Sequence, residues 1–237
     1  MNFEEIKDRF FKLRNEIERF GRDIRIVVVT KYVSDLDVIS KLSEIGVVDI
    51  GESYAQEMEY KYKELKNKNF PVDKYKWHFI GHLQKNKVKK VVPISCLIQS
   101  VDSVELLEKI NLEAQKINKV QSCLLELKVS DEPTKFGIEE EKIHQVVEKI
   151  ILLGLSNISI CGLMTMAPYF ENPEDTRPYF KKAYKVFCDL RKKVKNFDIL
   201  SMGMSNDYIV ALEEGANMIR VGSLLFGQNS SSCKLRD

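Results

Sequence analysis

The stretch RIVVVTKYVSDLDVI, residues 25–39, places an apolar run, a lysine and a helix start in direct succession. Its residues 26–29 have the β-branched composition of a buried strand. Ser34, with Asp37 three positions later, forms a variant of the capping box that begins helices. The segment therefore predicts a β-strand that leads into an α-helix, with Lys31 at the end of the strand.

The same succession of strand and helix repeats along the chain. Helical apolar spacing occurs, for example, in segments 103–118, 139–153 and 174–195. Short apolar runs with strand composition occupy residues 25–30, 47–50, 77–81, 96–100, 122–129, 158–164, 198–202 and 217–221. Eight such units in 237 residues predict an α/β fold, a closed (β/α)8 TIM-type barrel. A doubly wound parallel sheet is the alternative.

The two ends of the chain complement each other. Segment 223–237, SLLFGQNSSSCKLRD, is too short and polar for a covering helix after the eighth strand. Segment 2–20 is an amphipathic helix whose single apolar stripe could cover that place. No linker rich in Pro or Gly divides the sequence. We therefore expect one barrel domain over residues 1–237, with an extra N-terminal helix, a core at about 3–227 and a polar tail at 228–237.

Composition excludes several classes of partner. A net charge of +2, from 37 basic and 35 acidic residues, gives no overall field for nucleic acid. No apolar run approaches the about 18 residues that a membrane span needs. The five cysteines include no CxxC pair, which argues against a metal site or a disulfide framework. We expect a cytoplasmic protein with no nucleic-acid or membrane partner and no bound metal.

Candidate chemistry gathers where the strands end, because (β/α)8 barrels carry their sites at the C-terminal ends of the strands. Strands seven and eight end in SMGMSN (201–206) and RVGS (220–223). Small residues there expose amides and hydroxyls that bind phosphate, although glycines also serve plain tight turns. The amine of Lys31 beside such a cradle could attack an aldehyde to form a Schiff base. Otherwise Lys31 reaches solvent or pairs with Asp35.

Other polar residues favour structural roles. Lys128 is the competing buried lysine, and Glu126 on the same strand face favours an ion pair between them. His78 and His82 lie on a strand and its turn, where the spacing of four does not bring them together on a metal. Ser205 is predicted to begin a helix that Gly215 ends.

Seven motifs resemble those of the YggS/PROSC family, the pyridoxal 5′-phosphate (PLP) homeostasis proteins. In order they are VVVTKY, GESYAQE, WHFIGHLQKNKVK, SVDS, VSDEPTKFG, CGLMTMAPY and LSMGMSNDYIVALEEGANMIRVGSLLFG. They keep the order and spacing of the family from about residue 3 to Gly227. The resemblance implies the barrel of the N-terminal domain of alanine racemase.

Site residues follow from the resemblance residue by residue. Lys31 resembles the lysine that holds PLP as a Schiff base, and Arg220 resembles the arginine near the pyridine ring. The residues that resemble the phosphate cradle are Ser201, the Met202 backbone, Gly222 and Ser223. Ser53 stands where the family's GEN motif has Asn, so its hydroxyl replaces an amide.

The resemblance implies a monomeric protein that carries and buffers PLP in the cell without catalysis of its own. Its expected partners are PLP, other B6 vitamers and, transiently, PLP-dependent apo-enzymes. A minimal PLP-dependent amino-acid racemase is the alternative, although racemases of this fold draw a tyrosine from a second domain for which this sequence leaves no room. An aldolase-type Schiff-base enzyme and a scaffold with a vestigial site are further alternatives.

Overall fold

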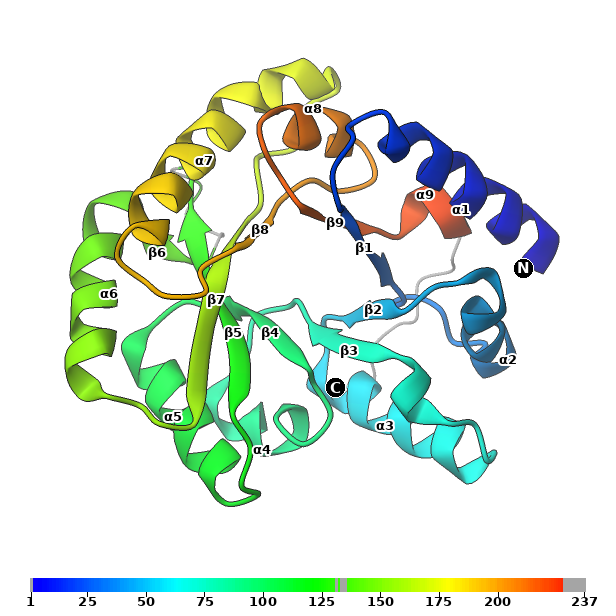
Figure 1. Ribbon diagram of the computed structural model, residues 1–237. Helices are drawn as coiled ribbons and strands as arrows, with labels where there is room; N and C mark the ends of the chain where they lie inside the picture. Colours follow the sequence, from blue (N-terminus) through cyan, green and yellow to red (C-terminus); the bar gives the residue numbers. More distant parts are fainter. Residues whose placement is uncertain (1, 131, 133–135, 228–237) are drawn as a thin grey trace.

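Eight parallel strands form a closed ring in the computed structural model, which describes residues 2–130, 132 and 136–227 (Figure 1). They are β1 (Arg25–Val29), β2 (Asp49–Glu52), β3 (Lys76–Phe79), β4 (Leu97–Val101), β5 (Gln121–Lys128), β7 (Ile158–Thr165), β8 (Ile199–Ser201) and β9 (Met218–Val221). They pair in the order β4-β3-β2-β1-β9-β8-β7-β5, and β4 also pairs with β5. This last pairing closes the barrel, which confirms the predicted fold over the doubly wound sheet.

Every predicted run coincides with a barrel strand to within two residues at either end. The largest shift is at β2, which begins at Asp49 rather than at Val47. Gly51 and Glu52 continue this strand because they pair with Val29 of β1 and Phe79 of β3. One strand was not predicted: β6 (Ile138–Glu139) is a two-residue extension that pairs with β5 outside the ring.

Helices surround the ring on its outer face (Figure 1). They are α1 (Phe3–Glu18), α2 (Leu36–Lys41), α3 (Ala55–Asn67), α4 (Val88–Val91), α5 (Val104–Gln115), α6 (Glu140–Leu153), α7 (Arg177–Arg191), α8 (Tyr208–Glu213) and α9 (Ser223–Phe226), with 3-10 turns η1 (Leu42–Ile45), η2 (Val72–Lys74), η3 (Lys85–Lys87) and η4 (Pro173–Thr176). Their apolar faces and the outward strand residues form one continuous core. Within the described part of the chain, no helix is both long and apolar enough to span a bilayer.

The N-terminal helix α1 lies beside the short α9, in the place expected for it (Figure 1). Its buried stripe consists of Ile6, Phe10, Leu13 and Ile17. Arg9 fastens the two helices, because its Nη1 donates to the carbonyl oxygen of Leu225 over 3.0 Å. The predicted extra helix is therefore confirmed, and it covers the last strand together with α9.

The N-cap of α2 differs from the prediction. Asp35 caps the helix, and its Oδ1 accepts from the amides of Asp37 and Val38 at 3.0 and 3.3 Å. The predicted cap, Ser34, lies one residue earlier. A carboxylate is also favoured at this place because it complements the positive end of the helix dipole.

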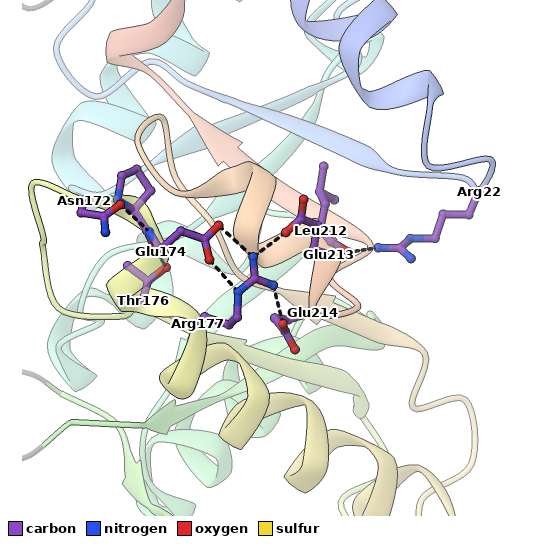
Figure 2. Close-up of polar contacts among 9 residues, drawn as sticks. Arg22, Asn172, Glu174, Thr176, Arg177, Leu212, Glu213 and Glu214 are labelled. Carbon is purple, nitrogen blue, oxygen red and sulfur yellow. Dashed lines mark hydrogen bonds and ion pairs between the residues drawn. The ribbon is translucent and has the colours of Figure 1, made fainter.

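An arginine cluster holds α7 against α8, as Figure 2 shows. Arg177 donates to Glu174 over 2.8 Å and to Glu213 and Glu214 over 2.6 Å each. Glu174 lies in η4, whereas Glu213 and Glu214 lie at the end of α8. The cluster thereby fixes α8, the helix that follows the loop after β8.

Candidate functional site

A pocket of about 450 Å³ opens at the C-terminal end of the barrel. Its wall is built mainly from the segments that follow β1, β2, β3, β7, β8 and β9. Among the residues that line it are Lys31, Ser53, Ser205, Asn206, Gly222 and Ser223. The structure therefore brings together in one pocket several of the residues that the sequence singled out.

Lys31 lies in the pocket wall directly after β1 and is half-buried. Its Nζ lies 4.7 Å from the centroid of the Tyr32 ring. The alternative pairing with Asp35 is absent, because among the described residues the Nζ of Lys31 has no hydrogen bond or ion pair and Asp35 caps α2 instead. Apart from the ring of Tyr32, the amine therefore has no partner among the residues that the structure describes.

A buried ion pair lies against the backbone of Thr30, the residue before Lys31. Lys61 of α3 donates to Glu52 Oε1 and to the carbonyl oxygen of Thr30, each over 2.8 Å. The hydroxyl of Thr30 donates to the same Glu52 oxygen over 2.5 Å. Burial raises the pKa of Glu52, and Lys61 opposes the rise. Three side chains therefore fix the backbone that immediately precedes Lys31.

The turns after β8 and β9 form a nest of backbone amides. The Oγ of Ser205 accepts from the amides of Gly222 and Leu224 at 3.2 and 3.1 Å, which joins the two turns. The amides of Ser205, Asn206 and Ser223 have no hydrogen-bond partner in the described part of the chain. Adjacent unpaired amides at one concave place bind anions such as phosphate.

Ser205 was predicted to begin α8, and that prediction is wrong. The helix begins at Tyr208, after Asp207, whose Oδ1 accepts from the amide of Met204 over 2.6 Å. Gly215 follows the end of the helix at a φ of 99°, as predicted. The place of Ser205 and Asn206 in the pocket wall was not predicted from the sequence. The only signal for it was their position in the motif after the seventh strand.

Ser201 and Met202 lie behind the pocket wall and are fully buried. The Oγ of Ser201 accepts from Arg220 Nη1 and donates to Gln99 Oε1, each over 2.7 Å. The amide of Met202 donates to the carbonyl oxygen of Met218 over 3.1 Å. Both groups have partners within the protein, and the assignment of these two residues to a phosphate stays a prediction.

Arg220 lies at the floor of the pocket with only 4% of its surface exposed. Its Nη2 donates to the carbonyl oxygen of Thr165 over 2.9 Å. Burial lowers the pKa of the guanidinium to about 10, against the opposing charges of Asp207 and Glu126. The guanidinium stays cationic at neutral pH and gives this pocket a fixed positive charge.

Glu126 is a buried acid near this guanidinium. Burial raises its pKa to about 7, the charge of Asp102 adds to the rise, and Arg220 opposes it. Among the described residues, Lys128 forms no ion pair with Glu126 and is not one of the charges that act on it, so the predicted pair does not form. The side chain of Glu126 is only 3% exposed, and the basic residue whose charge acts on it is Arg220.

The fold and the pocket define a class of protein: a (β/α)8 barrel in which a lysine amine, an arginine and an amide nest meet at the C-terminal end of the strands. An amine forms Schiff bases with aldehydes, and an amide nest takes phosphate. The donor set therefore suits a compound that carries both groups.

Comparisons with known proteins identify the family. The alanine racemase N-terminal domain family matches residues 1–230. The pyridoxal phosphate homeostasis protein of Aquifex aeolicus is 40% identical over 92% of this chain and 93% of its own, and that of Homo sapiens is 30% identical over 94% and 85%. The chain belongs to this YggS/PROSC family of pyridoxal phosphate homeostasis proteins.

Solved structures agree with the fold. PipY of Synechococcus elongatus PCC7942 with PLP bound is 30% identical, with a TM-score of 0.81 over 94% of this chain and 100% of its own. The alanine racemase of Clostridium difficile 630 is 20% identical, with a TM-score of 0.71 over 94% of this chain and 57% of the racemase. The racemase likeness shows the shared barrel alone.

Proposed function

We propose that this protein binds pyridoxal 5′-phosphate and carries it on Lys31 as a Schiff base, in order to buffer the cofactor in the cell. The observation that carries the proposal is one pocket that holds the amine of Lys31 and three backbone amides, none of which has a hydrogen-bond partner among the described residues. Its relatives support it, since they are named pyridoxal phosphate homeostasis proteins and PipY has a structure with PLP bound.

Each residue has a defined task in this proposal. Bound PLP supplies a reactive aldehyde. The Nζ of Lys31 bonds to the aldehyde carbon, and the aldehyde oxygen leaves as water. The unpaired amides of Ser205, Asn206 and Ser223 and the hydroxyl of Ser223 surround the phosphate. Ser201, Met202 and Gly222 are kept as the further contacts that the sequence predicted. Arg220 and the hydroxyl of Ser53 hold the ring.

The pocket wall favours a carrier over a racemase. Racemisation needs a second base opposite the lysine, held in place by its surroundings. Among the described residues of the wall, Tyr32 and Tyr169 are the remaining groups that could serve, and they are 50% and 79% exposed. Neither phenol hydroxyl has a hydrogen-bond partner in the described part of the chain. We therefore propose that the protein has no catalysis of its own.

The proposed setting is that of a cofactor reservoir. We propose a monomer in the cytoplasm that binds PLP and other B6 vitamers and meets PLP-dependent apo-enzymes transiently. No nucleic-acid or membrane partner belongs to this proposal.

An absorbance spectrum tests the covalent link. The purified protein with added PLP is expected to turn yellow, and borohydride should then fix the cofactor mass on the peptide that contains Lys31. Lys31→Ala should stay colourless, whereas Lys128→Ala, which removes the competing lysine, should colour like the wild type. A label on Lys128, or a colourless wild-type protein in excess PLP, would refute the proposal.

Exchange of the α-proton tests the racemase alternative. The PLP-loaded protein in deuterated water is expected to leave the α-proton of common amino acids in place. Exchange that Lys31→Ala abolishes would instead show a catalyst.

A further inference from the structure

A row of polar side chains runs through the barrel interior from the opposite end of the strands to Arg220. Asp49 Oδ1 lies 2.8 Å from His78 Nε2, and His78 Nδ1 lies 2.9 Å from Gln99 Nε2. Gln99 Oε1 lies 2.7 Å from the hydroxyl of Ser201, which in turn lies 2.7 Å from Arg220 Nη1. Five strands, β2, β3, β4, β8 and β9, contribute one residue each.

The row has a single direction of donation. Arg220 can only donate, so the oxygen of Ser201 accepts from it and the Ser201 proton goes to Gln99 Oε1. The amide nitrogen of Gln99 then donates to Nδ1 of His78. His78 donates from Nε2 to the carboxylate of Asp49, which can only accept when ionised. Each contact of the row therefore pairs one donor with one acceptor.

The surroundings make this arrangement rigid. Gln99 and Ser201 are both 0% exposed, and His78 is 1% exposed. They pass through an apolar interior layer formed by Val27, Leu97, Leu124, Met164 and Met218. Without water to replace a lost partner, a break at any place leaves a buried polar atom unpaired, which is costly.

We propose that Gln99 and His78 are positioning residues for the cofactor, because they hold Ser201 in the one orientation that accepts from Arg220 and so fix the guanidinium at the pocket floor. The inference rests on the proposed function, in which Arg220 meets the ring of PLP. It assigns a task to interior residues that do not line the pocket. If the row is broken, Arg220 keeps its bond to the Thr165 carbonyl but loses its second anchor.

Gln99→Leu tests the proposal against a matched control, Gln121→Leu. Both glutamines are fully buried and each makes three hydrogen bonds, but those of Gln121, to Cys96, Ser122 and Ser95, lie apart from Arg220. We expect Gln99→Leu to raise the dissociation constant for PLP about tenfold, because this is the typical effect of losing one well-placed contact to a charged group. Gln121→Leu should bind PLP as the wild type does, whatever it costs in melting temperature.

The pH dependence of the yellow band gives a second readout. A fixed guanidinium disfavours a second positive charge nearby. The midpoint of the band's pH titration should therefore rise in Gln99→Leu and stay unchanged in Gln121→Leu. Gln99→Glu keeps an acceptor for Ser201, and we expect it to bind PLP more tightly than Gln99→Leu. His78→Phe breaks the row at a residue that has no proposed contact with PLP, and it serves if Gln99→Leu does not fold.

The outcomes separate the two proposals. A wild type that stays colourless with PLP overturns the proposed function itself. If the wild type binds PLP and Gln99→Leu matches it in affinity and pH titration, the positioning role is wrong. Equal losses in Gln99→Leu and Gln121→Leu would overturn it as well, because they would reflect general loosening of the barrel.

Discussion

Lys61 and Glu52 form an ion pair of 2.8 Å whose side chains are only 5% and 0% exposed. The pair joins helix α3 to the end of β2, and through the Thr30 carbonyl to the end of β1. Lys31 directly follows Thr30, and Ser53 directly follows Glu52. This one ion pair between α3 and β2 thus supports the two neighbouring segments of the pocket wall that carry Lys31 and Ser53.

Removal of the lysine from this pair should destabilise the fold. Lys61→Met leaves the carboxylate of Glu52 buried without its counter-charge, which typically costs about 3–5 kcal/mol. We expect a loss of that order in the free energy of unfolding at neutral pH, measured with urea. Lys63→Met is the matched control on the same helix, because Lys63 is 65% exposed in its pair with Glu59. It should lose less than about 1 kcal/mol. Equal losses would contradict a special role for the buried pair.

Glu126 should make stability depend on pH near neutrality. Its folded-state pKa of about 7 lies above the ordinary value of 4.5, so its favourable contribution is complete below the ordinary value and is lost as pH rises through 7. The full change is roughly 3 kcal/mol. Relative to Glu126→Gln, the wild type should therefore lose free energy of unfolding between about pH 5 and pH 8. Glu139→Gln is the control, because Lys142 lowers the pKa of Glu139 and any effect falls at acid pH. A pH-independent difference between wild type and Glu126→Gln would show that Glu126 does not titrate there.

Local patterns in the sequence predicted the barrel because each strand and each helix is a continuous segment of the chain. Each strand is an apolar run and most helices are periodic segments, so β1 and Lys31 could be placed before any contact was known. The number of strand–helix repeats, eight, then predicted that the sheet closes into a barrel. The N-cap of α2 was misplaced by one residue, since Ser34 and Asp35 are both good cap residues and only the backbone geometry decides between them.

The contacts that complete the site could not be predicted in this way. Ser205 meets the amide of Gly222, and Gln99 meets Ser201 across the barrel interior. These contacts depend on strand register and on closure, which set the partners of residues far apart in sequence. Glu126 illustrates the same limit, because its neighbour in the sequence pattern was Lys128 whereas the basic charge that acts on it is that of Arg220.

Gly203 should resist substitution because the loop after β8 needs its left-handed backbone. Its φ is 93°, and a Cβ there would lie 2.6 Å from the Cβ of Ala211 and 2.9 Å from the Cα of Tyr208. We expect Gly203→Ala to lower the free energy of unfolding by about 2–4 kcal/mol, from strain and crowding together. Gly21→Ala separates the two effects, because Gly21 has a φ of 60° with open space around it and should lose only about 1 kcal/mol. Similar losses at both positions would argue against crowding at Gly203.

Arg177 should stabilise the protein in a salt-dependent way. It meets three glutamates but remains 27% exposed, so each pair contributes only a fraction of a kcal/mol (Figure 2). Arg177→Ala should therefore lower the free energy of unfolding by about 1–2 kcal/mol at low ionic strength, and by less in about 1 M salt, where surface charges are screened. Lys192→Ala, at the C-cap of the same helix, is the control. Lys192 makes a single pair with Asp189, and the two side chains are 76% and 44% exposed, so its removal should change the free energy of unfolding little. A loss at Arg177 that salt does not reduce would show that the side chain stabilises α7 and α8 by packing rather than by charge.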